Sequence, residues 1–177
     1  MIDYFLKKIN EMAIYQPYLR LPEGKRKLVH PTIPDDELFA QEWMNEPHVN
    51  SKYREDELTY KIAGNERVRS KSEIIIASIL DKYNIPYKYE MPIFDNKGRI
   101  LARPDFTVLN VRKRKVFYWE HFGMMDDNEY VNKTIIKHRM YTENGIYLGQ
   151  SLICTYESLE NPIDVEDVER IVKAYLL

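Results

Sequence analysis

The 177-residue sequence predicts an α/β fold in which a mixed four-stranded sheet lies between flanking helices. Two observations predict this class. From about residue 70 the hydrophobic pattern runs in the order helix, three strands, helix, strand and helix. Short turns separate the first three strands, so these are antiparallel neighbours, whereas a full helix leads to the fourth. Such a helical crossover gives layers of helix and sheet around one core.

The first helix of this region begins at Ser70. Ser70 and Glu73 have the spacing of a capping box, in which both side chains satisfy free amide groups at a helix start. Apolar residues recur at helical spacing as far as residue 82. Residues 85–93 then alternate between apolar and polar side chains, which is the period of a half-buried strand.

The remaining elements follow from turn signals and periodicity. A turn is expected at residues 95–98, and a cap formed by Asn144 and Gly145 ends the second helix. The expected order after the first turn is a strand at 99–109, a turn at 112–115, a strand at 116–122, a helix at 127–143, a strand at 146–155 and an amphipathic helix at 165–176.

The amino-terminal part is predicted to be a separate helical segment at residues 1–66, followed by the α/β domain at 67–177. Residues 2–14 can form one amphipathic helix, and another is expected to begin at Pro34, a favoured first helical residue. The Pro-rich and basic stretch at 16–31 is predicted to be a loop. Because this segment lacks a self-sufficient core, we expect it to serve recognition, to bind a partner or to link further domains of a longer protein.

The composition excludes a protein that is drawn to nucleic acid by its overall charge. Lys and Arg total 26 and Asp and Glu total 28, so the net charge is −2. Any contact with DNA must therefore come from local basic clusters. Cys154 is the single cysteine, which excludes an internal disulfide and suits a reducing cytoplasm. No apolar run approaches the roughly 20 residues of a membrane helix, so we expect a cytoplasmic protein without membrane contact.

Two acidic residues near strand ends are candidates for chemistry. Asp105 follows Pro104, which cannot donate to a strand ladder and so marks an edge or a bulge. Glu120 lies near the end of the next strand, directly after an apolar run. A short turn joins these strands, so the two carboxylates can converge at one end of the sheet. A divalent cation would offset both their repulsion and their burial. The alternative is that each carboxylate caps a strand end in solvent.

Three motifs in this order resemble those of the PD-(D/E)xK nuclease superfamily, in a bacterial branch. They are SKSE at residues 70–73, PDF at 104–106 and WEHFG at 119–123. The resemblance covers about residues 69–177. It implies a restriction-endonuclease-like αβββαβ core and a Mg²⁺-dependent DNA nuclease in which Asp105 and Glu120 bind the metal, with Mn²⁺ as a substitute.

Glu73 is the third acid that the resemblance implies for the metal site. Its helical position places it above Ala77 and Leu80 on the face toward the sheet, where an acid needs a partner. The alternative is a purely local role as the acidic member of the capping box with Ser70.

The usual catalytic lysine is absent from its expected position. The superfamily places it two residues after the strand glutamate, where this chain has Phe122. One substitute is Lys137 on the following helix, to which several branches of the superfamily have moved the basic residue. Lys137 is aligned with Tyr130, Thr134 and Tyr141. The other substitute is His121, although strand alternation directs it to the opposite face. A solvated lysine and a packed histidine are the alternatives.

These residues together predict hydrolysis of DNA phosphodiester bonds. Mg²⁺ held by Asp105, Glu120 and Glu73 would polarise the phosphate, while Lys137 would position water or stabilise the developing charge. The residues expected to contact DNA are Arg69, Lys71, Arg112, Lys113, Arg114 and Tyr141. A homodimer is a further expectation, because cutting both strands usually needs two active sites.

Three other functions are compatible with the sequence. A nuclease fold that lost cleavage would bind DNA or a partner without cutting. A zinc hydrolase would use His121, His138 and Glu120, although these residues lack the compact spacing of a zinc site on one helix. A structural or partner-binding role is suggested by the Tyr- and Pro-rich amino-terminal segment.

Overall fold

The computed structural model describes residues 20–26, 28, 34–46, 60–61 and 67–177. The chain divides into two compact units, Met1–Asn45 and Glu46–Leu177, whereas the sequence places the boundary at residue 66. The predicted helix at 2–14 lies outside the described residues.

The first unit contains two described helices. The short α2 (Glu23–Arg26) falls inside the stretch predicted to be a loop. The longer α3 (Asp36–Asn45) begins just after Pro34, close to the predicted start. The Asp35 carboxylate accepts a hydrogen bond of 2.6 Å from the Leu38 amide, which satisfies a free donor in the first helical turn.

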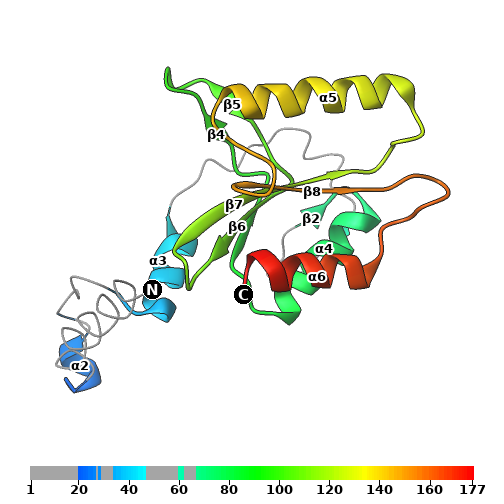
Figure 1. Ribbon diagram of the computed structural model, residues 1–177. Helices are drawn as coiled ribbons and strands as arrows, with labels where there is room; N and C mark the ends of the chain where they lie inside the picture. The colour runs from blue at the N-terminus through cyan, green and yellow to red at the C-terminus, as the bar shows by residue number, and fades with distance from the viewer. Residues whose placement is uncertain (1–19, 27, 29–33, 47–59, 62–66) are drawn as a thin grey trace, which may run out of the picture. The chain divides into compact units, whose positions relative to one another are not determined.

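The second unit is built on a four-stranded sheet in the order β3, β6, β7 and β8. These strands are β3 (Tyr87–Tyr89), β6 (Phe106–Asn110), β7 (Lys115–Phe122) and β8 (Leu152–Tyr156). The first three are antiparallel neighbours, and β8 runs parallel to β7. Helix α5 covers one face of this sheet, while α4 and α6 cover the other (Figure 1). The predicted α/β class with a mixed sheet between helices is confirmed.

Each of the three helices of this unit begins within one residue of its predicted start. They are α4 (Lys71–Lys82), α5 (Asn128–Glu143) and α6 (Val165–Tyr175). Each has a side-chain cap at its start, from Ser70, Asp127 and Asp164 respectively. Gly145 has a φ of 76°, a conformation that glycine adopts without strain, so the chain leaves α5 where expected.

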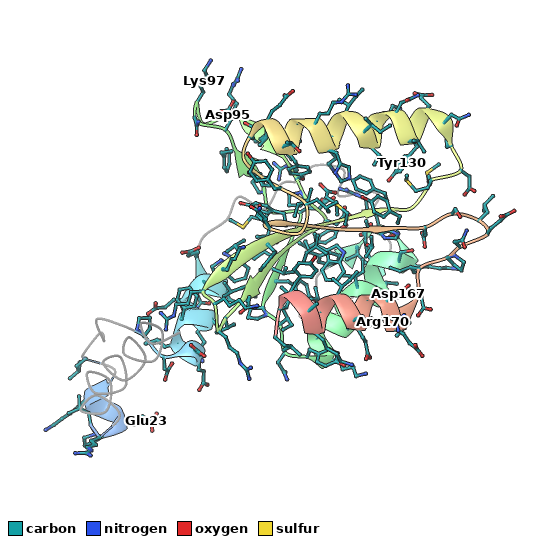
Figure 2. All side chains as sticks on the ribbon, in the orientation of Figure 1. Glu23, Asp95, Lys97, Tyr130, Asp167 and Arg170 are labelled. Atoms are coloured by element: carbon teal, nitrogen blue, oxygen red, sulfur yellow. The ribbon has the colours of Figure 1, made fainter. Side chains whose placement is uncertain are left out.

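Two predicted strands are interrupted in the structure. The stretch at 85–93 gives β3 and a separate β4 (Ile93–Phe94), because Glu90 has a φ of 45° and breaks the extended backbone. The stretch at 99–109 gives β5 (Ile100–Ala102) and β6, separated at Pro104, which has no amide hydrogen to donate. Strands β4 and β5 pair with each other, and their turn carries Asp95 and Lys97 at its tip (Figure 2).

Two further differences concern short strands. The predicted strand at 146–155 begins later, at Leu152, because residues 146–151 form turns around Gly149, which has a φ of 77°. A two-stranded pair, β1 (Tyr60–Lys61) and β2 (Arg67–Val68), precedes α4.

Every helix in the described part of the chain is too short or too polar to cross a membrane.

The two faces of the sheet differ in polarity. Between the sheet and helices α4 and α6 lies the larger apolar core, which includes Ile76, Phe106, Trp119 and Val168. A smaller cluster on the α5 face includes Ala102, Tyr141, Ile146 and Leu152. Strand alternation directs Glu120 to this second face, so its carboxylate is enclosed by side chains from the helix rather than by the main core.

Candidate active site

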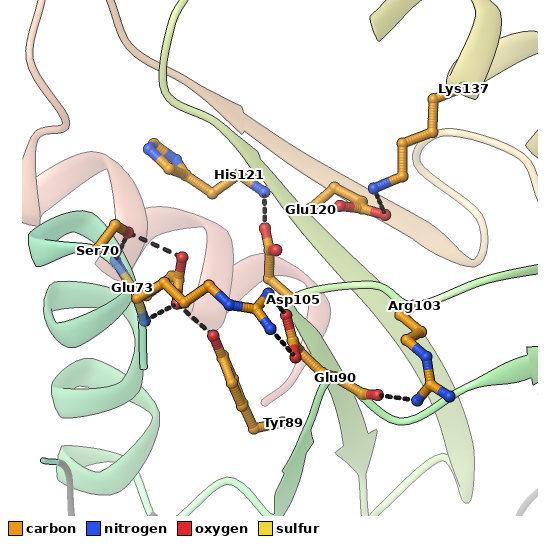
Figure 3. Close-up of polar contacts among 10 residues, drawn as sticks. Ser70, Glu73, Tyr89, Glu90, Arg103, Asp105, Glu120, His121 and Lys137 are labelled. Atoms are coloured by element: carbon orange, nitrogen blue, oxygen red, sulfur yellow. Dashed lines mark hydrogen bonds and ion pairs between the residues drawn. The ribbon is translucent and has the colours of Figure 1, made fainter. Parts of the chain in front are cut away.

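The pairing of β6 with β7 brings Asp105 beside Glu120. Phe106 pairs with Trp119, and the next residues outward along the same register are Asp105 and Glu120. Figure 3 shows the two carboxylates next to each other, with Glu73 on one side and Lys137 on the other. The predicted convergence of the two acids at one end of the hairpin therefore agrees with the structure.

Glu120 is a buried carboxylate with two donors from one helix. The residue is only 1% exposed. Its Oε1 atom accepts a hydrogen bond of 2.5 Å from the Tyr141 hydroxyl and lies 2.7 Å from Lys137 Nζ. Lys137 and Tyr141 are one helical turn apart on α5, so both reach the same oxygen. The other oxygen, Oε2, accepts no hydrogen bond from any described residue and stays available.

The Asp105 carboxylate is affected both by burial and by two neighbouring acids. Its Oδ2 atom accepts a hydrogen bond of 2.6 Å from the His121 amide. Burial raises the pKa of Asp105 well above its ordinary value, the nearby Glu120 charge raises it further, and Glu73 adds a smaller effect in the same direction. The His121 amide and the Lys137 ammonium oppose this shift in pKa. A bound cation would favour the ionised form of both acids.

Lys137 reaches the buried carboxylate of Glu120 from helix α5. Its Nζ atom is 6.0 Å from the ring centroid of Phe122, the residue that occupies the usual lysine position. The Lys137 side chain is 34% exposed, so its ammonium contacts buried Glu120 and solvent. The prediction that α5 directs Lys137 toward the carboxylates is confirmed, and its catalytic role stays a prediction.

Glu73 is held by the start of its own helix and by β3. Its carboxylate accepts hydrogen bonds from the Ser70 hydroxyl at 2.9 Å, the Arg69 amide at 3.0 Å and the Tyr89 hydroxyl at 2.7 Å. These are the contacts of the capping-box alternative, extended by Tyr89. Among the described residues, no three acidic, histidine or cysteine side chains are grouped as a metal site. Metal binding by Glu73 therefore stays a prediction, with its oxygens already engaged.

The His121 ring faces away from the two carboxylates, as strand alternation predicts. Its Nδ1 atom is 3.0 Å from Thr155 Oγ1, and its Nε2 atom is 3.2 Å from Glu157 Oε1. Glu157 also accepts a hydrogen bond of 2.7 Å from the Ser72 hydroxyl. His121 contacts the site only through its backbone amide, which donates a hydrogen bond to Asp105. These contacts are those of a packed histidine, the alternative to a catalytic role for His121.

The zinc set is not assembled in the structure. His138 Nε2 lies 3.2 Å from the Tyr156 hydroxyl and 3.8 Å from Cys154 Sγ, on the α5 face of the sheet. His121 contacts Thr155 on the opposite face. The two imidazoles are thus separated by the sheet and do not converge on Glu120.

The predicted DNA contacts occupy three different environments. Arg69 forms a bidentate ion pair with Glu90, with one hydrogen bond of 2.9 Å, so its guanidinium is committed to a neighbouring acid. Lys71 is exposed at the start of α4, near Glu73. Residues 112–114 are exposed in the turn between β6 and β7, at the opposite end of this hairpin from Asp105 and Glu120.

One predicted DNA contact needs correction. Tyr141 is 1% exposed and donates to Glu120, so it is part of the interior and not of the surface. Sequence reasoning aligned Tyr141 with Lys137 but missed its bond to Glu120. Their spacing of one helical turn was the available signal, because two polar side chains on a sheet-facing stripe need a buried partner.

Comparisons with known proteins leave the family open. No family model matches the chain, and no solved structure matches it. Over 81 residues it is 33% identical to a protein of Methanocaldococcus jannaschii described as uncharacterized protein MJ1519. The matched part is 45% of this chain and 7% of that protein, so the chain spans a small fraction of its relative.

Proposed function

We propose that the chain is a Mg²⁺-dependent deoxyribonuclease with a restriction-endonuclease-like core, which hydrolyses DNA phosphodiester bonds. The observation that carries this proposal is the Asp105 and Glu120 pair, with the Lys137 ammonium 2.7 Å from Glu120. The strand and helix order of the second unit is compatible with that core.

The donor set of this pair fits a hard divalent cation. Asp105 Oδ1 and Glu120 Oε2 are carboxylate oxygens without a hydrogen-bond donor among the described residues, and burial together with the neighbouring Glu120 charge raises the pKa of Asp105. Mg²⁺ commonly binds through one or two carboxylates, with water and substrate phosphate completing its shell. When bound, such an ion would neutralise phosphate charge and activate a water molecule. Mn²⁺ would suit the same oxygens.

The residues around the pair orient it and supply a cation of their own. The His121 amide fixes one Asp105 oxygen, and the Tyr141 hydroxyl fixes one Glu120 oxygen. These bonds leave the second oxygen of each acid for the ion. Lys137 is solvent-accessible on one side, so its ammonium can also donate to a phosphate oxygen and stabilise the charge that develops during hydrolysis.

Cleavage assays test this proposal directly. The wild-type protein should cut labelled DNA with Mg²⁺ or Mn²⁺ and not with EDTA, and Asp105→Asn and Glu120→Gln should each remove cutting. Glu160→Gln, at an exposed position, is the matched control and should cut normally. If both site variants cut as fast as the wild type, the proposal is wrong.

A second candidate is a module of the same fold that binds DNA without cutting it. The engaged carboxylate of Glu73 favours this alternative, because it leaves two acids instead of three for a metal. DNA binding without Mg²⁺-dependent cleavage at high protein concentration would select it.

A further inference from the structure

Three aromatic rings gather at the carboxyl ends of β7 and β8. Phe122 and Tyr156 are paired in the parallel register of these strands. Their rings are stacked, with centroids 5.5 Å apart and planes inclined by 21°. The His138 ring from α5 completes the cluster at 5.4 Å from Phe122. This end of the sheet therefore carries an aromatic cluster made of side chains from two strands and a helix.

Tyr156 is the exposed member of this cluster. It is 45% exposed, while Phe122 behind it is 4% exposed. The Tyr156 hydroxyl lies 3.2 Å from His138 Nε2, which holds the ring in place. One face of the ring is thus packed on Phe122, the hydroxyl is tethered, and a large aromatic surface still contacts solvent. A rigid aromatic ring of this kind needs little ordering when a flat ligand binds.

The exposed ring lies beside the proposed active site. Phe122 is two residues beyond Glu120 on the same strand, and its ring is contacted by Tyr156 on one side and approached to 6.0 Å by Lys137 Nζ. A hollow of about 390 Å³ between the end of β8 and α6 is lined by Tyr156 together with Asn161, Asp164, Asp167 and Arg170, and α6 covers the face of the sheet opposite α5. The Phe122 ring is thus the link between the exposed Tyr156 ring and the Lys137 ammonium.

A nucleobase is the flat group that the proposed substrate would supply. Bases stack on aromatic side chains regardless of sequence, because every base has a π-face. In a duplex both faces of a base are covered by its neighbours, so a protein ring can stack only on a base that is unpaired, frayed or terminal. The exposed Tyr156 ring can stack on such a base, whereas a base inside an intact helix offers it no free face.

We propose that Tyr156 stacks on an unpaired nucleobase next to the scissile phosphate, which makes single-stranded or frayed DNA the preferred substrate. This inference rests on the proposed nuclease function for its substrate and names the form of DNA that the same site takes. Tyr156 is a binding residue in this account and takes no part in bond cleavage.

Binding measurements with non-cleaving protein test the inference. In Asp105→Asn protein, a further Tyr156→Ala change should lower affinity for a labelled single-stranded oligonucleotide about tenfold. It should leave the weaker affinity for a blunt duplex unchanged. Tyr156→Phe should retain most of the affinity, because the ring remains. Tyr147→Ala is the matched control, since Tyr147 is also 45% exposed but lies outside the cluster.

The inference is overturned if Tyr156→Ala binds single strands as tightly as its parent, or loses single-strand and duplex affinity equally. Tyr156→Leu keeps apolar volume without a stacking face and should match Tyr156→Ala, which covers the case in which the alanine protein fails to fold. Binding needs no metal, so the two proposals fail separately. Wild-type protein that never cuts but needs Tyr156 for single strands would contradict only the nuclease function.

Discussion

The ammonium of Lys137 lies 2.7 Å from Oε1 of Glu120 and joins helix α5 to the central strand β7. Phe122 occupies the strand position where the nuclease pattern has a lysine, and the helix returns a positive charge to the same neighbourhood. Because Glu120 is 1% exposed, loss of Lys137 would leave a buried carboxylate without its cation, so the pair matters for folding as well as for the site. A change at either residue should therefore alter both stability and activity, and the two effects can be measured independently.

Replacing Lys137 should expose both roles. Lys137→Gln leaves the buried Glu120 charge with Tyr141 as its remaining donor and should lower the free energy of unfolding by about 2 kcal/mol. Cleavage should fall by roughly a hundredfold, because a cation near the phosphate is lost. Lys137→Arg keeps the charge and should recover most of the stability with partial activity. Urea unfolding measures the effect on stability, and initial cleavage rates measure the effect on activity. If the Lys137→Gln protein cleaves as fast as the wild type, Lys137 has only a structural role.

Removing the Tyr141 hydroxyl should disturb the orientation of Glu120. Tyr141→Phe keeps the ring in the core but deletes the donor to Oε1, so we expect a loss of about 1 kcal/mol in unfolding free energy. The concentration of Mn²⁺ needed for half-maximal thermal stabilisation should rise, because Glu120 is less well held. Tyr118→Phe is the control, since the half-buried Tyr118 hydroxyl has no hydrogen bond with the described residues. Equal metal affinity in both variants would contradict this role.

The raised pKa of Asp105 predicts how stability depends on pH without metal. The unfolded chain ionises Asp105 at its ordinary pKa, while the folded protein resists ionisation to a higher pH. Stability from this group is present below the ordinary pKa and is lost as pH rises through the folded value. Asp105→Asn should remove this decrease and make the metal-free protein more stable at neutral pH. Mg²⁺ should stabilise the wild type there and not the variant.

The pH comparison reports on Asp105 because the other acids with shifted pKa values keep the same surroundings in both proteins. The pKa of Glu90 is also raised, chiefly by burial against the opposing effect of Arg69. The pKa of Glu157 is lowered, and that of Glu169 falls to about 2. These effects cancel when unfolding curves of the two proteins are subtracted at each pH. Identical curves for wild type and Asp105→Asn would show that Asp105 carries no unfavourable charge.

Salt dependence should separate DNA contacts near the site from distant ones. Lys71→Ala removes an exposed cation at the start of α4, the helix that carries Glu73, so cleavage of a short oligonucleotide should weaken and the salt slope of binding should fall by about one. Replacing residues 112–114 with alanine should weaken binding of long DNA only, because that turn lies at the far end of the hairpin. Equal effects on short and long DNA would contradict this arrangement.

Local sequence signals predicted the elements whose ends have chemical markers. Ser70, Asp127 and Asp164 cap their helices, and Gly145 ends α5, so these bounds followed from residue type. The splitting of strands around Glu90 was harder to foresee, because a positive φ at a glutamate depends on tertiary contacts. Arg69 pairs with Glu90 from a distant part of the chain, and alternation alone cannot show this.

The site was predictable to the extent that it depends on strand register. Asp105 and Glu120 converge because a short turn fixes the pairing of β6 with β7, which the sequence indicates. Lys137 could be placed only as one of two candidates, since its reach depends on how α5 packs. The roles of Tyr141 and Tyr89 as donors to buried acids needed the three-dimensional arrangement, because neither motif nor spacing names the partner.

Diffraction from crystals soaked in Mn²⁺ tests the central claim most directly. The account predicts an anomalous peak between Asp105 Oδ1 and Glu120 Oε2, with the Lys137 ammonium nearby, and no peak there in crystals of Asp105→Asn. An intact Asp105 and Glu120 pair without a peak at saturating Mn²⁺, or an ion bound elsewhere that supports cleavage, would contradict it.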